Sequence, residues 1–207
     1  AAACLALCIG AATASAADER GMTTAVMIDE EFALDGAMGN PKWKDAPKLV
    51  LGDCNSKDKA RYATWAKILF GPKHVYIGVH CAEPDTDGML RKAVRRDGQV
   101  WRDDCVEVFL QADPELPYCH ICVNSKGVFY DARNKDKSRD VSIVTRTTVV
   151  DGKHWRVEIK VPLAEIGAYV GDGQPWRVNL NRTGRGRGAD ATMECSWAVL
   201  AGRNYHV

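Results

Sequence analysis

The sequence lacks the features that mark several large classes of protein. After residue 16 it has no long hydrophobic run, so we expect the remainder of the chain to be soluble, with no membrane insertion. Its 28 basic and 27 acidic residues leave a net charge of +1, which gives no electrostatic basis for binding nucleic acid or an anionic membrane. It shows no internal repeat and no long amphipathic helical pattern. These absences leave a globular protein with enough chain for one well-buried core.

The common catalytic motifs are missing as well. There is no nucleophile elbow, no HExxH pattern and no Ser-His-Asp order. The enzyme class that fits best is a glycosidase, which would need two carboxylates about 5 to 10 Å apart. Asp103 and Glu107 could share one strand face, but carboxylates beside turns are common. We therefore expect no catalytic activity of the chain's own.

The first 16 residues are almost all small or apolar, and Ala14-Ser15-Ala16 has the form of a signal-peptidase site. We interpret residues 1–16 as the remnant of an export signal, 17–27 as a polar leader and 28–207 as a single domain. This organisation predicts a secreted, periplasmic or cell-envelope protein.

Six cysteines follow the predicted signal: Cys54, Cys81, Cys105, Cys119, Cys122 and Cys195. Export would permit disulfides, and six cysteines allow fifteen full pairings, so the sequence does not fix the pairing. Cys119 and Cys122 lie in a strand pattern, where residues three apart point to opposite faces. That spacing argues against a local disulfide, a thioredoxin-type motif or a zinc ion shared by these two. We expect structural cysteines, either buried or disulfide-bonded.

Short alternating segments dominate the chain. Val106, Val108 and Leu110 alternate with Glu107 and Phe109, which is typical of a strand with one buried face. Asp151-Gly152 is a strong hairpin signal between two further strands. About ten such strands with frequent turns and little helix predict an all-β fold, an antiparallel β-sandwich of jelly-roll or immunoglobulin-like type. The strands are expected near 48–52, 62–70, 75–81, 106–110, 118–123, 127–132, 141–150, 154–161, 176–182 and 194–197.

The order of these elements resembles that of family 9 carbohydrate-binding modules and their DOMON-like β-sandwich relatives. The segments that carry the resemblance are LDGAMGNPKWKDA (34–46), HVYIGVHCAE (74–83), WRDDCVEVFL (101–110), ICVNSKGVFYDA (121–132), WRVEIKVPLAEIG (155–167), WRVNLNR (176–182) and ECSW (194–197). The resemblance implies a sugar held between two aromatic side chains, at the positions of Trp101 and Trp197. It also implies an acidic position at Glu107 and a polar position near Asn181. Cys122 departs from it, because sugar-binding members can carry a basic residue there.

A sugar ring has an apolar face, which an indole covers, and a rim of hydroxyls, which carboxylates and amides bind. The candidate ligand-binding residues are Trp101, Trp197, Asp104, Glu107, Asn179, Asn181 and Arg182. Simpler interpretations stay open: Glu107 as a solvated acid, Arg182 as its structural partner, and His120 as an ordinary strand residue. Other tryptophans are expected elsewhere, with Trp65 on a sheet surface and the following in the core: Trp43, Trp155 and Trp176.

The sequence offers candidate ligands for two cofactors, calcium and haem. Glu83, Asp85 and Asp87 offer oxygen ligands close in sequence, as a structural calcium would need, and the resemblance also implies calcium near Glu83. A haem-binding, redox-type relative of the same sandwich would need axial ligands; the available side chains are Met89, Met193, His80 and His120.

The main hypothesis is therefore non-catalytic binding of a poly- or oligosaccharide by an exported protein, in the service of carbohydrate breakdown. The haem-binding relative and an accessory module of a glycoside hydrolase are the alternatives. The sequence does not predict the sugar or the oligomeric state.

Overall fold

The computed structural model describes residues 22–56, 58–169, 175–185, 192–198 and 200, together with the backbone of residues 4–7. The Ala14-Ser15-Ala16 site therefore lies outside the described residues. Within the described part, no helix is long and apolar enough to cross a membrane.

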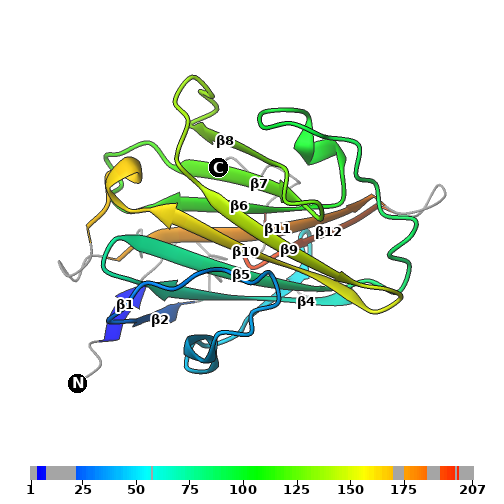
Figure 1. The fold of residues 1–207 in the computed structure, drawn as a ribbon, viewed down its shortest axis with the longest axis horizontal. Coiled ribbons are helices and arrows are strands. Elements are labelled where there is room, and N and C mark those ends of the chain that lie inside the picture. Colours follow the sequence, from blue (N-terminus) through cyan, green and yellow to red (C-terminus); the bar gives the residue numbers. More distant parts are fainter. Residues whose placement is uncertain are drawn as a thin grey trace.

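The described chain is all-β, as predicted, with three single-turn 3₁₀ helices and one sheet of 12 strands (Figure 1). The 3₁₀ helices are η1 (Pro41–Lys44), η2 (Val100–Arg102) and η3 (Ala164–Ile166). The strands are β1 (Cys4–Leu7), β2 (Thr23–Met27), β3 (Leu49–Asp53), β4 (Lys59–Phe70), β5 (His74–Ala82), β6 (Cys105–Gln111), β7 (Cys119–Asn124), β8 (Phe129–Arg133), β9 (Val144–Val150), β10 (His154–Pro162), β11 (Arg177–Arg185) and β12 (Thr192–Ser196).

The sheet runs in the order β8-β7-β6-β11-β12-β3-β4-β5-β10-β9, and every neighbouring pair on this path is antiparallel. Only two residue pairs join β12 to β3, Cys195 with Asp53 and Ser196 with Gly52. The strands on either side of this short join form two half-sheets that pack on a common core. This arrangement is the predicted sandwich. Outside the path, β2 pairs with β4 in parallel and with β1, so a strand occupies part of the segment expected to be a polar leader.

The main core lies between the two halves and is built from alternate residues of each strand. Val106, Val108 and Leu110 of β6 face it, as their alternation predicted. Trp155 and Trp176 are buried in it, and Trp43 is buried in a second cluster, which confirms the predicted core tryptophans. Trp65 is half-buried on a sheet surface, as expected, where its ring stacks on His80 with 5.0 Å between centroids.

A loop before η1 is attached to the sheet by one carboxylate. Glu158 of β10 is fully buried and accepts hydrogen bonds from the indole Nε1–H of Trp43 at 2.8 Å and from the backbone N–H groups of Asp35 and Gly36. Gly36 has a φ of +78°, and a Cβ there would come within 2.9 Å of the Thr147 backbone, so the turn requires glycine. Burial raises the pKa of Glu158, against the lowering effect of the Trp43 bond.

All six cysteines after residue 16 are buried, so of the two predicted forms the structure shows the buried one. Cys119 belongs to the main core, whereas Cys122 lies in a separate cluster with Cys105 and Val100. The two residues of the CxxC spacing therefore occupy opposite faces of β7, as the strand periodicity predicted.

Candidate functional site

The half-sheet β8-β7-β6-β11-β12 has a second face, turned away from the main core, that carries buried polar groups. We call it the polar face. Cross-strand pairing arranges its side chains in two rows, since residues directly opposite in register share a face. The first row is Ser196, Asn181, Glu107, Cys122 and Tyr130, and the second is Asn179, Phe109, His120 and Ala132.

Glu107 lies at the middle of this face and is only 5 % exposed. Its carboxylate is 2.7 Å from Nε2 of His120, the one hydrogen-bond partner that it has within the described chain. The interpretation of Glu107 as a solvated acid is therefore wrong, because the side chain is buried. A carboxylate has room for several donors, so one partner leaves acceptor capacity for a ligand.

An aromatic row borders the Glu107–His120 pair. The His120 ring stacks on Phe109 with 4.3 Å between centroids and 7° between planes. Tyr130 meets His120 edge-on at 5.6 Å, and Trp101 meets Tyr130 edge-on at 5.3 Å. The row thus leads from the buried acid to Trp101, which is 39 % exposed.

Asn181 stands directly opposite Glu107 in the register and is 1 % exposed. Its Oδ1 accepts a hydrogen bond from Asn179 at 3.2 Å, but its Nδ2 has no hydrogen-bond partner among the described residues. A buried amide donor without a partner costs about 1–3 kcal/mol. Asn179 is different, because its Oδ1 accepts from Leu180, Ser196 and Ala198 and so holds β11 to the end of β12.

The loop that carries Trp101 is fixed by two buried acids. Asp103 accepts from the backbone of Lys92 and Ala93 and from the side chain of Asn124, at 2.8 to 2.9 Å. Asp104 accepts from the backbone of Leu90 at 2.7 Å. These bonds give Asp103 a structural role in holding the loop.

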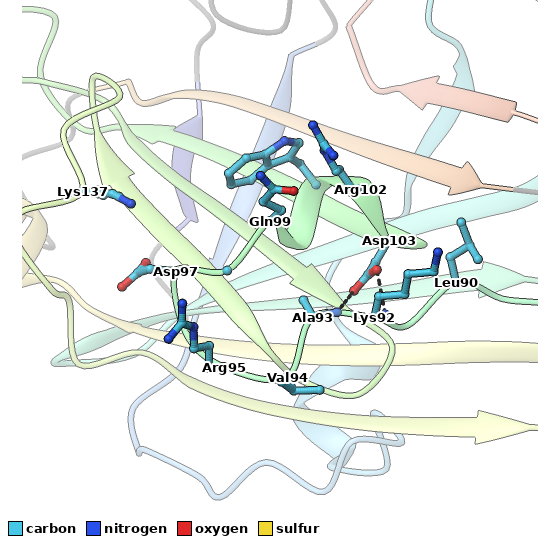
Figure 2. A pocket seen from close by; sticks show the side chains of 12 residues that line it. Leu90, Lys92, Ala93, Val94, Arg95, Asp97, Gln99, Arg102, Asp103 and Lys137 are labelled. Atoms are coloured by element: carbon cyan, nitrogen blue, oxygen red, sulfur yellow. Dashed lines mark hydrogen bonds between the residues drawn. The ribbon is translucent and has the colours of Figure 1, made fainter.

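Beside this loop lies an open groove of about 790 Å³, shown in Figure 2. Trp101 forms part of its wall, and most of its charged side chains are basic. The charged residues that line it are Lys92, Arg95, Asp97, Arg102, Asp103 and Lys137. The groove therefore presents a positive surface next to the most exposed indole of the polar face.

Two of the predicted ligand-binding residues lie elsewhere. Arg182 points from β11 into the interior, is completely buried and pairs with Glu83 at 3.2 Å; it also donates to Thr64 at 3.0 Å. It follows Asn181 in a strand, so it must face the other way. Trp197 is half-buried and packs against the main core. In place of a second indole, the polar face holds Tyr130.

The candidate calcium ligands and the candidate haem ligands do not form clusters in the described chain. Glu83 is directed to Arg182, while Asp85 and Asp87 are exposed on the following turn. Among the potential haem ligands, Met89 and Met193 lie in the main core. The two histidines are far apart in the topology: His80 is on β5, against Trp65, and His120 is on β7, on the polar face.

The sequence reasoning missed His120 and Tyr130 as members of the site. The signal was present for His120, because it alternates with Cys119 and Ile121 and so had to share a face with Cys122. Its pairing with Glu107 needed the register between β6 and β7, which places Phe109 opposite His120.

Comparison with known proteins shows the same fold. A Bacteroides uniformis protein whose carbohydrate binding is inferred matches with a TM-score of 0.63 at 18% identity, over 79% of this chain and 83% of that one. A family 9 carbohydrate-binding module of Caldicellulosiruptor kristjanssonii in complex with cellotriose matches with a TM-score of 0.60 at 13% identity, over 83% and 87%. A family 9 module of that organism in complex with glucose gives 0.54 at 14%, over 82% and 84%.

No protein-family model matches the chain, and no curated protein sequence matches it. The resemblance inferred from the sequence is thus confirmed at the level of the fold.

Proposed function

We propose that the polar face binds a carbohydrate without catalysing its cleavage. The observation that carries the proposal is the Nδ2 group of Asn181, a buried donor with no partner among the described residues, which lies directly opposite Glu107, an acceptor with one partner there. A sugar hydroxyl both donates and accepts, so one hydroxyl can bridge an amide N–H and a carboxylate. The fold shared with modules that bind cellotriose and glucose supports this choice of ligand.

Trp101 supplies the second element of the proposed site. Its exposed ring lies beside Tyr130 at the edge of the polar face, where it can cover the C–H face of a sugar ring. The hydroxyls on the rim of that ring then reach Glu107 and Asn181. A site with one aromatic platform and a few polar contacts gives modest affinity, on the order of micromolar to millimolar.

The groove beside Trp101 extends the proposal to longer ligands. Its basic side chains favour a saccharide with acidic units, such as uronic acids, because charge-assisted hydrogen bonds are stronger than neutral ones. Export and a role in carbohydrate breakdown belong to the same proposal. The support for export is the Ala14-Ser15-Ala16 pattern.

A fluorescence and calorimetric titration tests the proposal with Trp101→Ala and a matched control, Trp65→Ala. The ligands are neutral β-linked oligosaccharides and oligogalacturonate, chosen after a glycan-array screen. We expect saccharide binding by the wild type, a loss of at least about tenfold in affinity for Trp101→Ala, and unchanged affinity for Trp65→Ala.

Trp65 is a suitable control because it is an indole that also reaches the surface in part, but on the opposite half of the sandwich, against His80. If Trp65→Ala abolishes binding and Trp101→Ala does not, the polar face is not the site. A screen without any saccharide ligand would end the proposal.

A further inference from the structure

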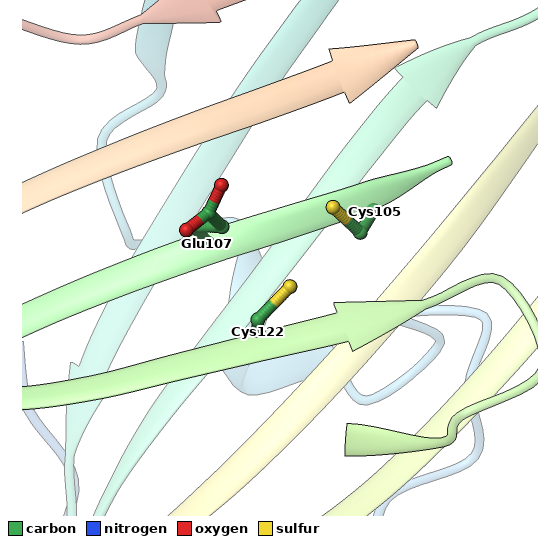
Figure 3. Close-up of side chains that lie close together, drawn as sticks. All are labelled: Cys105, Glu107 and Cys122. Atoms are coloured by element: carbon green, nitrogen blue, oxygen red, sulfur yellow. The ribbon is translucent and has the colours of Figure 1, made fainter. Parts of the chain in front are cut away.

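Two thiols and a carboxylate converge between β6 and β7, as Figure 3 shows. The ligand atoms of Cys105, Glu107 and Cys122 all lie within 4.8 Å of one another. Among the residues that the structure describes, this is the one group of three or more His, Cys, Asp or Glu side chains so arranged.

The strand register creates this group. Cys105 and Glu107 are two apart on β6 and so point to the same face, and Cys122 of β7 lies directly opposite Glu107. Both thiols are completely buried, and Val100 of η2 and Tyr130 of β8 pack against them. Hydrophobic packing therefore shields the two thiols from water.

We propose that Cys105, Cys122 and Glu107 bind one divalent cation of the zinc type. Zinc takes thiolate sulfur at about 2.3 Å and carboxylate oxygen at about 2.0–2.2 Å, so the ligand atoms of a bound ion are about 3.3–3.8 Å apart. The ligand atoms already lie within 4.8 Å of one another, so each pair must approach by at most about 1.5 Å to reach these values. Two sulfur ligands select zinc or cadmium over calcium or magnesium, which prefer oxygen.

His120 completes the proposed site as a positioning residue. Its Nε2 is 2.7 Å from the Glu107 carboxylate, which fixes the direction in which that carboxylate points. Outer partners of this kind orient metal ligands and raise affinity. Three protein ligands leave one position of a tetrahedral ion for water.

Binding exchanges the thiol protons for the metal. Burial raises the pKa of Cys122 well above its usual value, and the hydrogen bond shared with Cys105 acts in the same direction. The ion therefore enters with release of one proton from each thiol, and no electron is transferred.

A titration of the reduced full-length chain with Cd²⁺ tests the inference without any saccharide. We expect a thiolate-to-cadmium charge-transfer band that saturates at one equivalent and is removed by Zn²⁺. Cys105→Ala and Cys122→Ala should each abolish the band, and His120→Gln should weaken binding roughly 10- to 100-fold. Cys119→Ala is the control, because Cys119 lies on the same strand as Cys122 but faces the main core.

Circular dichroism and thermal melting of each variant show whether it is folded, and Cd²⁺ should raise the melting temperature of the wild type and of Cys119→Ala but not that of Cys105→Ala or Cys122→Ala. The inference is overturned if the reduced wild type gives no band, or if the band persists in folded Cys122→Ala. Recovery of a Cys105–Cys122 disulfide that, once reduced, leaves thiols unable to bind Cd²⁺ would also overturn it. None of these results bears on Trp101, so they are separate from the test of carbohydrate binding.

Discussion

Glu107 and Glu158 are both carboxylates buried in the middle of strands, but their surroundings differ. Glu158 accepts three N–H donors, one indole and two backbone groups, that use both of its oxygens. Within the described chain, Glu107 has one hydrogen-bond partner, His120, and it lies opposite an amide donor of Asn181 that has none. Glu158 of β10 thus has both of its oxygens satisfied by hydrogen bonds from the protein. Glu107 of β6 keeps acceptor capacity that the described residues do not use.

The difference supports a structural use for Glu158 and, under the proposed function, a ligand-binding use for Glu107. A saturated carboxylate holds elements together, here the loop of Gly36 and Trp43 on the sheet. A carboxylate with spare acceptor capacity, beside a donor that has no partner among the described residues, leaves hydrogen-bonding groups that a ligand can use. Burial alone does not distinguish the two, since both side chains are nearly inaccessible.

The largest expected effect on stability comes from Glu158→Gln. Both oxygens of Glu158 accept N–H groups, so either orientation of the new amide turns an NH₂ group toward a buried donor. Leaving such a donor unsatisfied costs about 1–3 kcal/mol. Chemical denaturation should show this loss in the free energy of unfolding. A stability equal to the wild type would contradict the structural role.

Glu107→Gln should have a smaller effect on stability and a larger one on binding. The side chain has a single partner, and the His120 ring can offer either a donor or an acceptor to the amide, so we expect a cost below about 1 kcal/mol. Removal of the charge-assisted bonds to a sugar should weaken binding by about tenfold.

Denaturation and saccharide titration on the same preparation check this pair of expectations. The comparison between the two acids fails if Glu107→Gln is as destabilised as Glu158→Gln, or if it binds as tightly as the wild type.

The sequence predicted much of the fold because alternation is local. Val106, Val108 and Leu110 had to face one side, and the separation of Cys119 from Cys122 followed from the same period of two. The local pattern also predicted that Trp155 and Trp176 are core residues.

The site was less predictable, because it depends on contacts between distant segments. Arg182 pairs with Glu83, 99 residues away, so only the tertiary fold shows that it is an interior ion pair. The pairing of His120 with Glu107 depends on the register of β6 and β7. The short strand β2 was missed because it forms by pairing with β4 and β1, which local composition does not reveal.

Nitrogen-edited NMR of the six indole N–H groups during a saccharide titration tests the central claim most directly. The account predicts that the Trp101 resonance moves together with the side-chain amide of Asn181, while Trp43, Trp155 and Trp176 stay in place. Movement of the Trp65 resonance without that of Trp101 or Asn181 would place the ligand on the other half of the sandwich and contradict the account.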